Sequence, residues 1–164
     1  MERLFTPWRA EFVTGQTGEQ GTRACFLCEN PTLDKDDELY ILHRAERSFI
    51  ILNLYPYNTG HLMIAPYEHI GALEELPAET GAEMWALAQR SVGIIKGEYG
   101  PDGFNVGMNI GRLAGAGVPG HLHLHVVPRW GGDTNFMAVV GETKLVPESL
   151  DQTYARLRPL FEAG

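Results

Sequence analysis

The sequence predicts an α+β domain built on an antiparallel five-stranded sheet, with one long helix and a C-terminal helix. Short runs of aliphatic and aromatic residues follow one another at hairpin spacing, one longer segment has helical periodicity, and glycine or proline punctuates the junctions. With 164 residues, the chain has the length of one domain of roughly 100–200 residues. We expect a single domain over residues 1–164, with its core at residues 25–140.

Three strands are expected in the first half of the chain. A short segment from Trp8 to Val13 opens it, and residues 15–22 have no apolar side chain to bury, which predicts an exposed loop. The strand segments that follow are rich in Ile, Leu, Tyr and Phe; a charged hairpin loop separates the first two, and a turn with Pro, Asn and Gly precedes the third. Their expected ranges are 39–43, 48–54 and 61–66.

A long helix opens the second half. Pro77 suits a first helical turn, apolar residues such as Met84, Ala88 and Ile95 recur at spacings of three and four, and Gly100 with the following proline ends the pattern. The remaining elements are two strands separated by a glycine-rich loop, and a final amphipathic helix. Their expected ranges are 104–110 and 121–127 for the strands, 111–120 for the loop and 147–161 for the helix.

Charge and composition exclude several classes of partner. Lys and Arg number 13 against 21 Asp and Glu, so the net charge is −8, whereas proteins that bind long nucleic acids or anionic membranes usually carry a basic surface. The longest apolar stretches, such as residues 49–52, are far shorter than the roughly 20 residues that span a bilayer. The first residues do not have the pattern of a signal peptide. We expect a cytoplasmic protein with reduced thiols.

Three of the six histidines alternate with apolar residues at positions 121, 123 and 125. In a strand, this spacing places the three imidazoles on one face, with alternate side chains about 6.6 Å apart. Such a row could be a partly exposed strand face, a zinc site with an open ligand position, or a nucleophilic imidazole whose neighbours hold phosphate oxygens. The loop at residues 111–120 favours the last interpretation, because small residues allow its backbone N–H groups to approach an anion.

Two further features concern cysteine and histidine. Cys25 and Cys28 have the spacing of half a zinc site, although a redox-active dithiol or a pair of buried apolar groups would give the same spacing. His43 lies in a predicted hairpin strand with no evident partner, and we expect it at the surface.

The segment from His121 to Val127 resembles the signature of the histidine triad (HIT) superfamily, in which three histidines alternate with apolar residues. Residues 53–66 are similar to the family's upstream strand, turn and strand, and residues 105–111 to its phosphate-side strand. Residues 127–136 resemble the branch that contains diadenosine tetraphosphate phosphorylases and dinucleoside polyphosphate hydrolases. The resemblance covers roughly residues 5 to 160 and implies a HIT-like fold.

The resemblance implies a nucleotide hydrolase or transferase that cleaves dinucleoside polyphosphates or related conjugates. His123 would be the nucleophile that forms a nucleotidyl-histidine intermediate, which water or inorganic phosphate then resolves. His125 would hydrogen-bond the α-phosphate or its bridging oxygen, while His121 and His61 would support the nucleophile. The competing interpretation is a nucleotide- and zinc-binding interaction module with little turnover.

Further roles follow from the same resemblance. Asn53 would bind the ribose hydroxyls. The apolar pocket for the base would be formed by Phe26, Leu27 and Ile51. The polar lining for the phosphates would be formed by Asn109, Gly115, Ala116 and Gly117. Many relatives have a Ser or Gln just before the triad to assist the leaving group, and this chain has none; Arg112 and Arg129 are candidate substitutes.

The resemblance also implies a metal and a partner. Relatives with an early Cys-x-x-Cys pair bind zinc with two added histidines, which correspond here to His69 and His121, so Cys25, Cys28, His69 and His121 would form a closed, structural zinc site. No organic cofactor is expected. Relatives form dimers through the helix near residues 77–99 and the neighbouring strand, and a homodimer is expected here.

Overall fold

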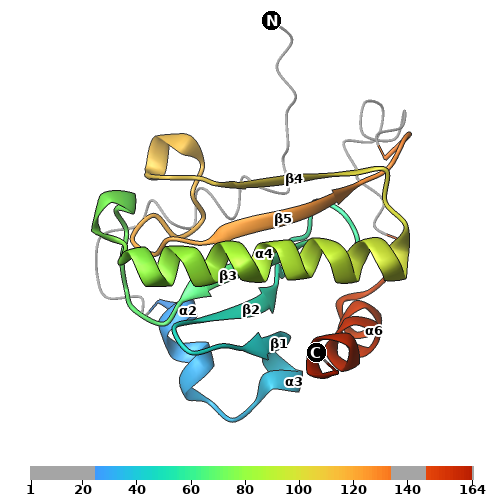
Figure 1. Cartoon of the computed structure of the whole chain (residues 1–164), viewed down its shortest axis with the longest axis horizontal. Coiled ribbons are helices and arrows are strands. Elements are labelled where there is room, and N and C mark those ends of the chain that lie inside the picture. Colours follow the sequence, from blue (N-terminus) through green and yellow to red (C-terminus); the bar gives the residue numbers. More distant parts are fainter. Residues whose placement is uncertain (1–24, 134–146, 164) are drawn as a thin grey trace, which may run out of the picture.

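The computed structural model describes residues 25–133 and 147–163, and these form an α+β fold around a five-stranded antiparallel sheet, as the sequence predicts (Figure 1). The sheet order is β1-β2-β3-β5-β4, so β4 is an edge strand. The strands are β1 Ile41–Arg44, β2 Ser48–Leu52, β3 Leu62–Pro66, β4 Gly103–Met108 and β5 Leu124–Arg129. The expected segments at residues 8–13 and 15–22, and the part of the expected core at 134–140, lie outside the described residues.

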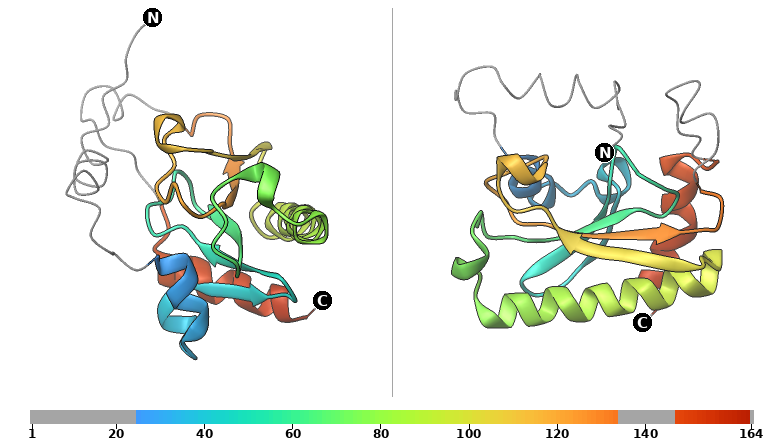
Figure 2. Two further views of the ribbon diagram at one scale, coloured as in Figure 1. Left: turned by 90° about the vertical axis from the view of Figure 1, so that its left-hand side faces the viewer. Right: turned by 90° about the horizontal axis from the view of Figure 1, so that it is seen from above.

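Four helices and three short 3-10 turns accompany the sheet within the described ranges. The helices are α2 Phe26–Glu29, α3 Asp36–Leu39, α4 Ala78–Tyr99 and α6 Leu150–Glu162, and the turns are η1 Asn30–Thr32, η2 Leu73–Glu75 and η3 Arg112–Ala114. In Figure 2, α4 lies on one side of the sheet and α2 on the other. Among the described residues, no helix is long and apolar enough to cross a membrane.

The first strand starts later than the sequence pattern predicts. Residues Asp36–Leu39 form α3, whose acidic first turn complements the positive end of the helix dipole. Tyr40 then takes a left-handed conformation, with φ at 58°, and ends the helix. Leu39 is therefore helical, and β1 begins at Ile41.

The alternation of side chains in each strand divides the core into two parts. On one face, residues such as Ile50, Ile64 and Val126 pack against α4 and α6. On the other face, Phe49 and Ile51 join a second cluster with Leu27 of α2. Every residue of β2 and β3 is buried, because both faces of these strands are covered. Met63 of the second cluster lies opposite His125 of β5. The histidine site therefore lies on the same face of the sheet as α2.

The two longer helices have clear end signals. Helix α4 ends at Gly100, whose φ of 58° is the left-handed conformation that glycine adopts at helix ends. Helix α6 begins after Ser149, whose side chain accepts a hydrogen bond from the Gln152 backbone while the Gln152 side chain accepts one from the Ser149 backbone. This capping box explains why the helix starts at Leu150 instead of Pro147.

His43 is half-buried, contrary to the expected surface position. Arg90 of α4 lies 3.3 Å from His43 Nε2, and the imidazole stacks on the Phe161 ring of α6. Burial, followed by the nearby Arg90 cation, lowers the pKa of His43.

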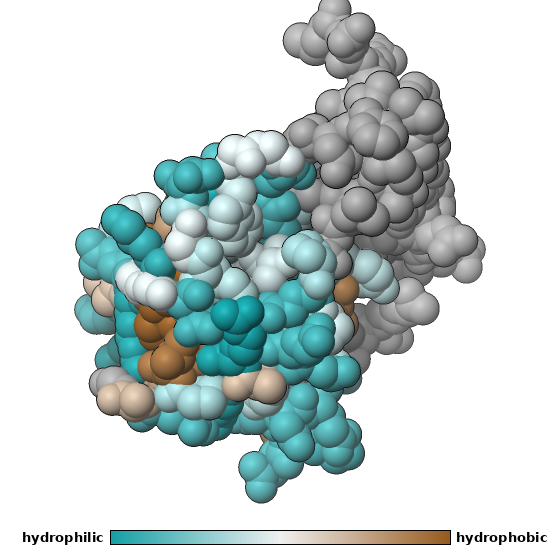
Figure 3. All heavy atoms as spheres, turned by 90° about the vertical axis from the view of Figure 1, so that its right-hand side faces the viewer, coloured by the Kyte–Doolittle hydropathy of each residue, from teal (hydrophilic) through white to brown (hydrophobic). Residues whose placement is uncertain are grey.

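The face on the right of Figure 1 is largely hydrophilic with one small hydrophobic patch (Figure 3), so the apolar side chains on this side are mainly internal.

Candidate active site and metal site

The three histidines of the triad segment do not all lie in one strand. β5 begins at Leu124, opposite Ile64 of β3. Two residues further along β3, Pro66 has no N–H to donate, and its carbonyl oxygen lies 2.9 Å from His121 Nε2. The ladder therefore stops before His121. His121 and His123 are buried, whereas His125 is half-buried, so the three imidazoles have different surroundings.

The protonation of His123 follows from its backbone contact. Its Nδ1 lies 2.8 Å from the carbonyl oxygen of His121, and a carbonyl only accepts, so Nδ1 carries the hydrogen and donates it. In the neutral ring, Nε2 then holds the lone pair. Burial lowers the pKa of His123, although the bond to the His121 carbonyl opposes the shift. At neutral pH this imidazole is uncharged, with Nε2 as its nucleophilic atom.

His125 has the opposite tautomer, because a chain of hydrogen bonds from Tyr57 through His61 reaches its Nδ1. The Tyr57 backbone N–H donates to His61 Nδ1 at 3.0 Å, so neutral His61 carries its hydrogen on Nε2. That Nε2 lies 3.0 Å from His125 Nδ1 and donates to it. Asn53 Nδ2 is a more distant neighbour of His61 Nε2, at 3.4 Å. His125 therefore carries its hydrogen on Nε2.

The two neighbouring imidazoles are thus complementary. Their ring centroids lie 4.9 Å apart; His123 presents a lone pair on Nε2 and His125 presents an N–H. A nucleophile beside a fixed donor is the arrangement needed to attack phosphorus while a phosphoryl oxygen is stabilised. His61 contacts His125, and His121 contacts His123 through its backbone. Tyr57 was not identified from the sequence, since a backbone N–H leaves no signature there.

The expected base-binding residues lie together on the face of the sheet that carries α2. Leu27 and Ile51 belong to one cluster, and Phe26 packs against it. Leu27 is 0% exposed and Ile51 is 1% exposed, so only Phe26 of these three has surface to offer a ligand. Asn53 is half-buried, next to His61.

The glycine-rich loop lies between β4 and the triad segment. Gly111 and Gly115 have φ values of 82° and 84°, which is the left-handed region that glycine adopts without strain, and η3 lies between them. Gly115 is exposed, Ala116 is buried and Gly117 is half-buried. Asn109 lines a cavity of about 460 Å³ along β4, in which His125 also takes part.

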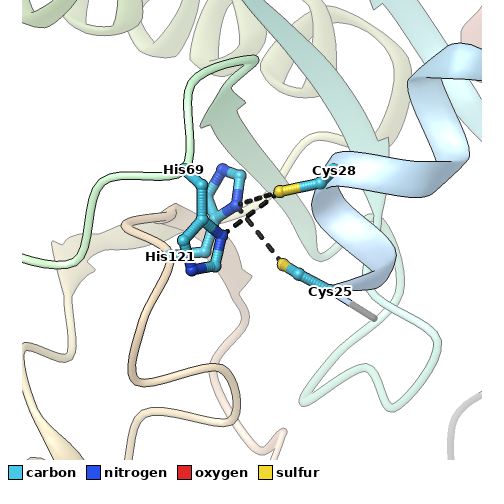
Figure 4. Close-up of side chains that lie close together, drawn as sticks. All are labelled: Cys25, Cys28, His69 and His121. Carbon is cyan, nitrogen blue, oxygen red and sulfur yellow. Dashed lines mark hydrogen bonds between the residues drawn. The ribbon is translucent and has the colours of Figure 1, made fainter. Parts of the chain in front are cut away.

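A second cluster brings Cys25, Cys28, His69 and His121 together. Cys25 caps α2 and Cys28 lies within it, while the histidines come from the loop after β3 and the segment before β5; Figure 4 shows the four side chains pointing toward one another. Their ligand atoms all lie within 4.8 Å of one another. Sulfur–nitrogen distances are 3.4 Å from His121 Nδ1 to each cysteine and 3.2 Å from His69 Nδ1 to Cys28.

These residues fit a tetrahedral metal ion. Zn–S bonds of about 2.3 Å and Zn–N bonds of about 2.0–2.1 Å require sulfur–nitrogen separations of roughly 3.6 Å, close to those observed. The His121 Nε2–H donates to the Pro66 carbonyl, which leaves the Nδ1 lone pair directed at the sulfurs. Burial and the neighbouring Cys25 raise the pKa of Cys28 to about 11, so binding a cation there releases the Cys28 proton.

Two glycines allow the two histidine-bearing segments to meet. A Cβ on Gly71 would lie 3.1 Å from the Gly120 backbone, and one on Gly120 would lie 3.2 Å from His69 Nε2. The Leu122 backbone N–H donates to the Ile70 carbonyl at 2.7 Å and ties the segments together. Neither glycine was singled out for this role from the sequence.

Together these features define an α+β protein with a histidine cluster suited to phosphoryl chemistry and a separate cysteine–histidine cluster that could hold a metal. The resemblance noted in the sequence is confirmed: residues 35–132 match the HIT domain, and the chain belongs to the HIT family.

Individual relatives extend the similarity over most of the chain. AP-4-A phosphorylase of Mycobacterium tuberculosis is 40% identical over 158 residues, which cover 93% of this chain and 80% of that protein. The bis(5'-adenosyl)-triphosphatase of Dictyostelium discoideum is 28% identical over 138 residues, 80% of this chain and 91% of that protein. Among solved structures, a Zn-bound histidine triad family protein from Mycobacterium smegmatis is 27% identical, with a TM-score of 0.69; the match covers 87% of this chain and 96% of that one.

Proposed function

We propose that this protein is an enzyme that cleaves dinucleoside polyphosphates, or related nucleotide conjugates, through a covalent intermediate on His123. The observation that carries the proposal is the complementary pair of imidazoles, with a lone pair on His123 Nε2 beside an N–H on His125 Nε2. The names of two relatives, AP-4-A phosphorylase and bis(5'-adenosyl)-triphosphatase, support this substrate class.

The reaction has two steps. His123 Nε2 attacks the α-phosphorus, an N–P bond forms, and the bond from phosphorus to the bridging oxygen breaks, so that the remaining phosphates leave with the other nucleoside. The His125 N–H stabilises the negative charge on the phosphoryl or bridging oxygen. Water or inorganic phosphate then attacks the phosphorus and releases His123.

Other side chains would hold the nucleotide. Phe26 would contact the base at the edge of the apolar cluster, and Asn53 would bind the ribose. Asn109 and the backbone amides of residues 115–117 would bind phosphate oxygens, for which the exposed, positive-φ Gly115 leaves room.

We further propose that the metal held by Cys25, Cys28, His69 and His121 is Zn²⁺. Two sulfurs and two imidazoles fill a tetrahedral shell, so the ion would be structural and would fasten α2 to the segments that carry the histidines. A cytoplasmic location would keep both thiols reduced for this purpose.

A homodimer through α4 and β4 is also proposed. β4 is an edge strand, whose unpaired backbone groups favour pairing with another chain. Val106 on β4 is 38% exposed and Trp85 on α4 is 56% exposed. Light scattering of the wild-type protein and of Trp85→Glu tests this: a dimer that the substitution weakens is expected, and a wild-type monomer contradicts it.

The activity is tested by incubating the protein with diadenosine tetraphosphate, with and without inorganic phosphate. AMP plus ATP as products indicates hydrolysis, and ADP plus ATP indicates phosphorolysis; either supports the proposal. Binding without turnover would instead support an interaction module. A chelator control separates the metal from the chemistry, because a structural ion leaves the initial rate unchanged while the protein remains folded.

A further inference from the structure

The cavity of about 460 Å³ is lined on β5 by His125, Val127 and Arg129, and the last two lie away from the nucleophile. Its floor is formed by β4 and β5, which pair so that Gly107 lies opposite His125 and Asn105 lies opposite Val127. A Cβ on Gly107 would meet no atom within 4 Å, so the floor is open beside His125. A ligand whose phosphorus lies at His123 therefore has space to continue along β5.

A cation lies farther along the same strand. Arg129 is four residues from His125, on the same face of β5, which is roughly 13 Å at about 3.3 Å per residue. His123 lies in the other direction along the chain. The nucleophile lies just before β5, and the strand itself carries the N–H donor and then the guanidinium, an order that suits an extended chain of phosphates.

Arg129 is held in place by three of its N–H groups. Its Nε and Nη2 donate to the two oxygens of Asp133, at 2.5 and 2.9 Å, and Nη1 donates to Asn105 Oδ1 at 2.8 Å. Asp133 is in turn fixed by Asn58 Nδ2 at 2.8 Å. A guanidinium has five N–H donors, so two have no partner among the described residues and are available to a ligand. A fixed fork of donors suits phosphate oxygens.

We propose that this cavity binds a phosphate group remote from the attacked phosphorus, with Arg129 and Asn105 as its anchors. This inference rests on the proposed function, because it takes His123 as the site of attack. Two sources have this chemistry: the distal phosphates of the nucleotide that leaves, and inorganic phosphate that enters as the second nucleophile. Asp133 offsets part of the Arg129 charge, which favours binding weak enough to permit release.

The test measures binding in a His123→Asn background, in which no turnover interferes. Isothermal titration calorimetry compares AMP, which has only the attacked phosphate, with ATP, which also has distal phosphates. Asn105→Asp is the main variant: its carboxylate still accepts from Arg129, so the local structure is retained, but it adds negative charge at the cavity. Arg129→Gln is the second variant. Gln89→Glu, at an exposed position of α4, adds the same charge elsewhere.

We expect both cavity variants to weaken ATP binding on the order of tenfold or more and to change AMP binding less than about twofold. Gln89→Glu should affect neither. Titration of inorganic phosphate into the AMP complex distinguishes the two sources. If phosphate binds there and the binding depends on Arg129, the cavity holds the incoming phosphate. If phosphate does not bind there, while the cavity variants still weaken ATP more than AMP, the cavity holds the distal phosphates of the leaving group.

Equal effects on AMP and ATP, or no effect on either, would overturn the inference. Dependence on Asn105 for diadenosine tetraphosphate but not for ATP would also overturn it, since a second nucleoside would then occupy the cavity. The proposed function is tested separately. If the wild-type protein does not turn over diadenosine tetraphosphate but still binds ATP more tightly than AMP through Arg129, the phosphate subsite is supported and the proposed reaction is refuted.

Discussion

Replacing His61 tests whether hydrogen bonds set the tautomer and orientation of His125. His61 is 1% exposed and links the Tyr57 backbone N–H to His125 Nδ1, with both contacts at 3.0 Å. His61→Leu fills this buried position with an apolar side chain and removes both hydrogen-bonding atoms. His125 then loses the hydrogen bond that His61 makes to its Nδ1.

The magnitude follows from two contributions. The lost hydrogen bond between uncharged groups contributes about 0.5–1.5 kcal/mol, and ordering the released His125 ring when substrate binds costs roughly 0.5–1.5 kcal/mol more. Their sum, about 1–3 kcal/mol, corresponds to a fall in kcat/KM of roughly 5- to 150-fold, since a factor of ten requires about 1.4 kcal/mol. His61→Gln, whose amide N–H can reach His125, should recover much of the loss.

The assay is the initial rate of nucleotide release from diadenosine tetraphosphate at substrate concentrations well below KM, which reports kcat/KM, measured below the melting temperature of each variant. Thermal melting checks the fold, because His61→Leu also removes the ring nitrogen that accepts from the Tyr57 backbone N–H. A folded His61→Leu protein that turns over within twofold of wild type would refute the reasoning. So would a glutamine variant as impaired as the leucine variant.

Three further predictions concern the nucleophile, the metal and pH. His123→Asn should reduce turnover by several orders of magnitude while the protein stays folded, and intact-mass spectrometry should find no nucleotidyl adduct; an adduct on this variant would place the nucleophile elsewhere. Cys25→Ser should lower zinc from about one ion per chain to well below that and reduce the melting temperature; unchanged zinc content would exclude the site. Burial, followed by the Arg90 cation, lowers the pKa of His43 from 6.5, so its contribution to stability is present above that value and declines as pH falls below it. The drop in melting temperature between about pH 7.5 and 5.5 should be smaller in His43→Gln, and equal drops would contradict this.

Local patterns predicted most of the secondary structure, and the differences have local causes. The long helix ends where Gly100 indicated, and the strand segments around residues 50 and 64 form the centre of the sheet. The alternation of histidines predicted a strand from residue 121, but β5 starts at Leu124. A proline across the ladder at Pro66 decides this, and its effect depends on which residue of β3 faces which residue of β5.

The metal-binding residues were only partly evident along the chain. The spacing of Cys25 and Cys28 indicates a metal-binding pair, because one turn of helix places both sulfurs on one side. His69 lies 41 residues from Cys28 and was assigned through family resemblance. Its approach depends on the contact between Gly71 and the Gly120 backbone, where any side chain would be crowded.

By itself, the sequence determined which chemical groups are available: alternating imidazoles, a cysteine pair, a glycine loop and a negative net charge. Only the tertiary structure decided which nitrogen of each imidazole carries hydrogen, because the carbonyl of Pro66 lies 55 residues from His121 and the Tyr57 N–H acts on His125 through His61. The cavity at Arg129 arises likewise from the pairing of β4 with β5. Hydrogen bonds are directional and short-ranged, so they depend on contacts between segments that the linear order does not specify.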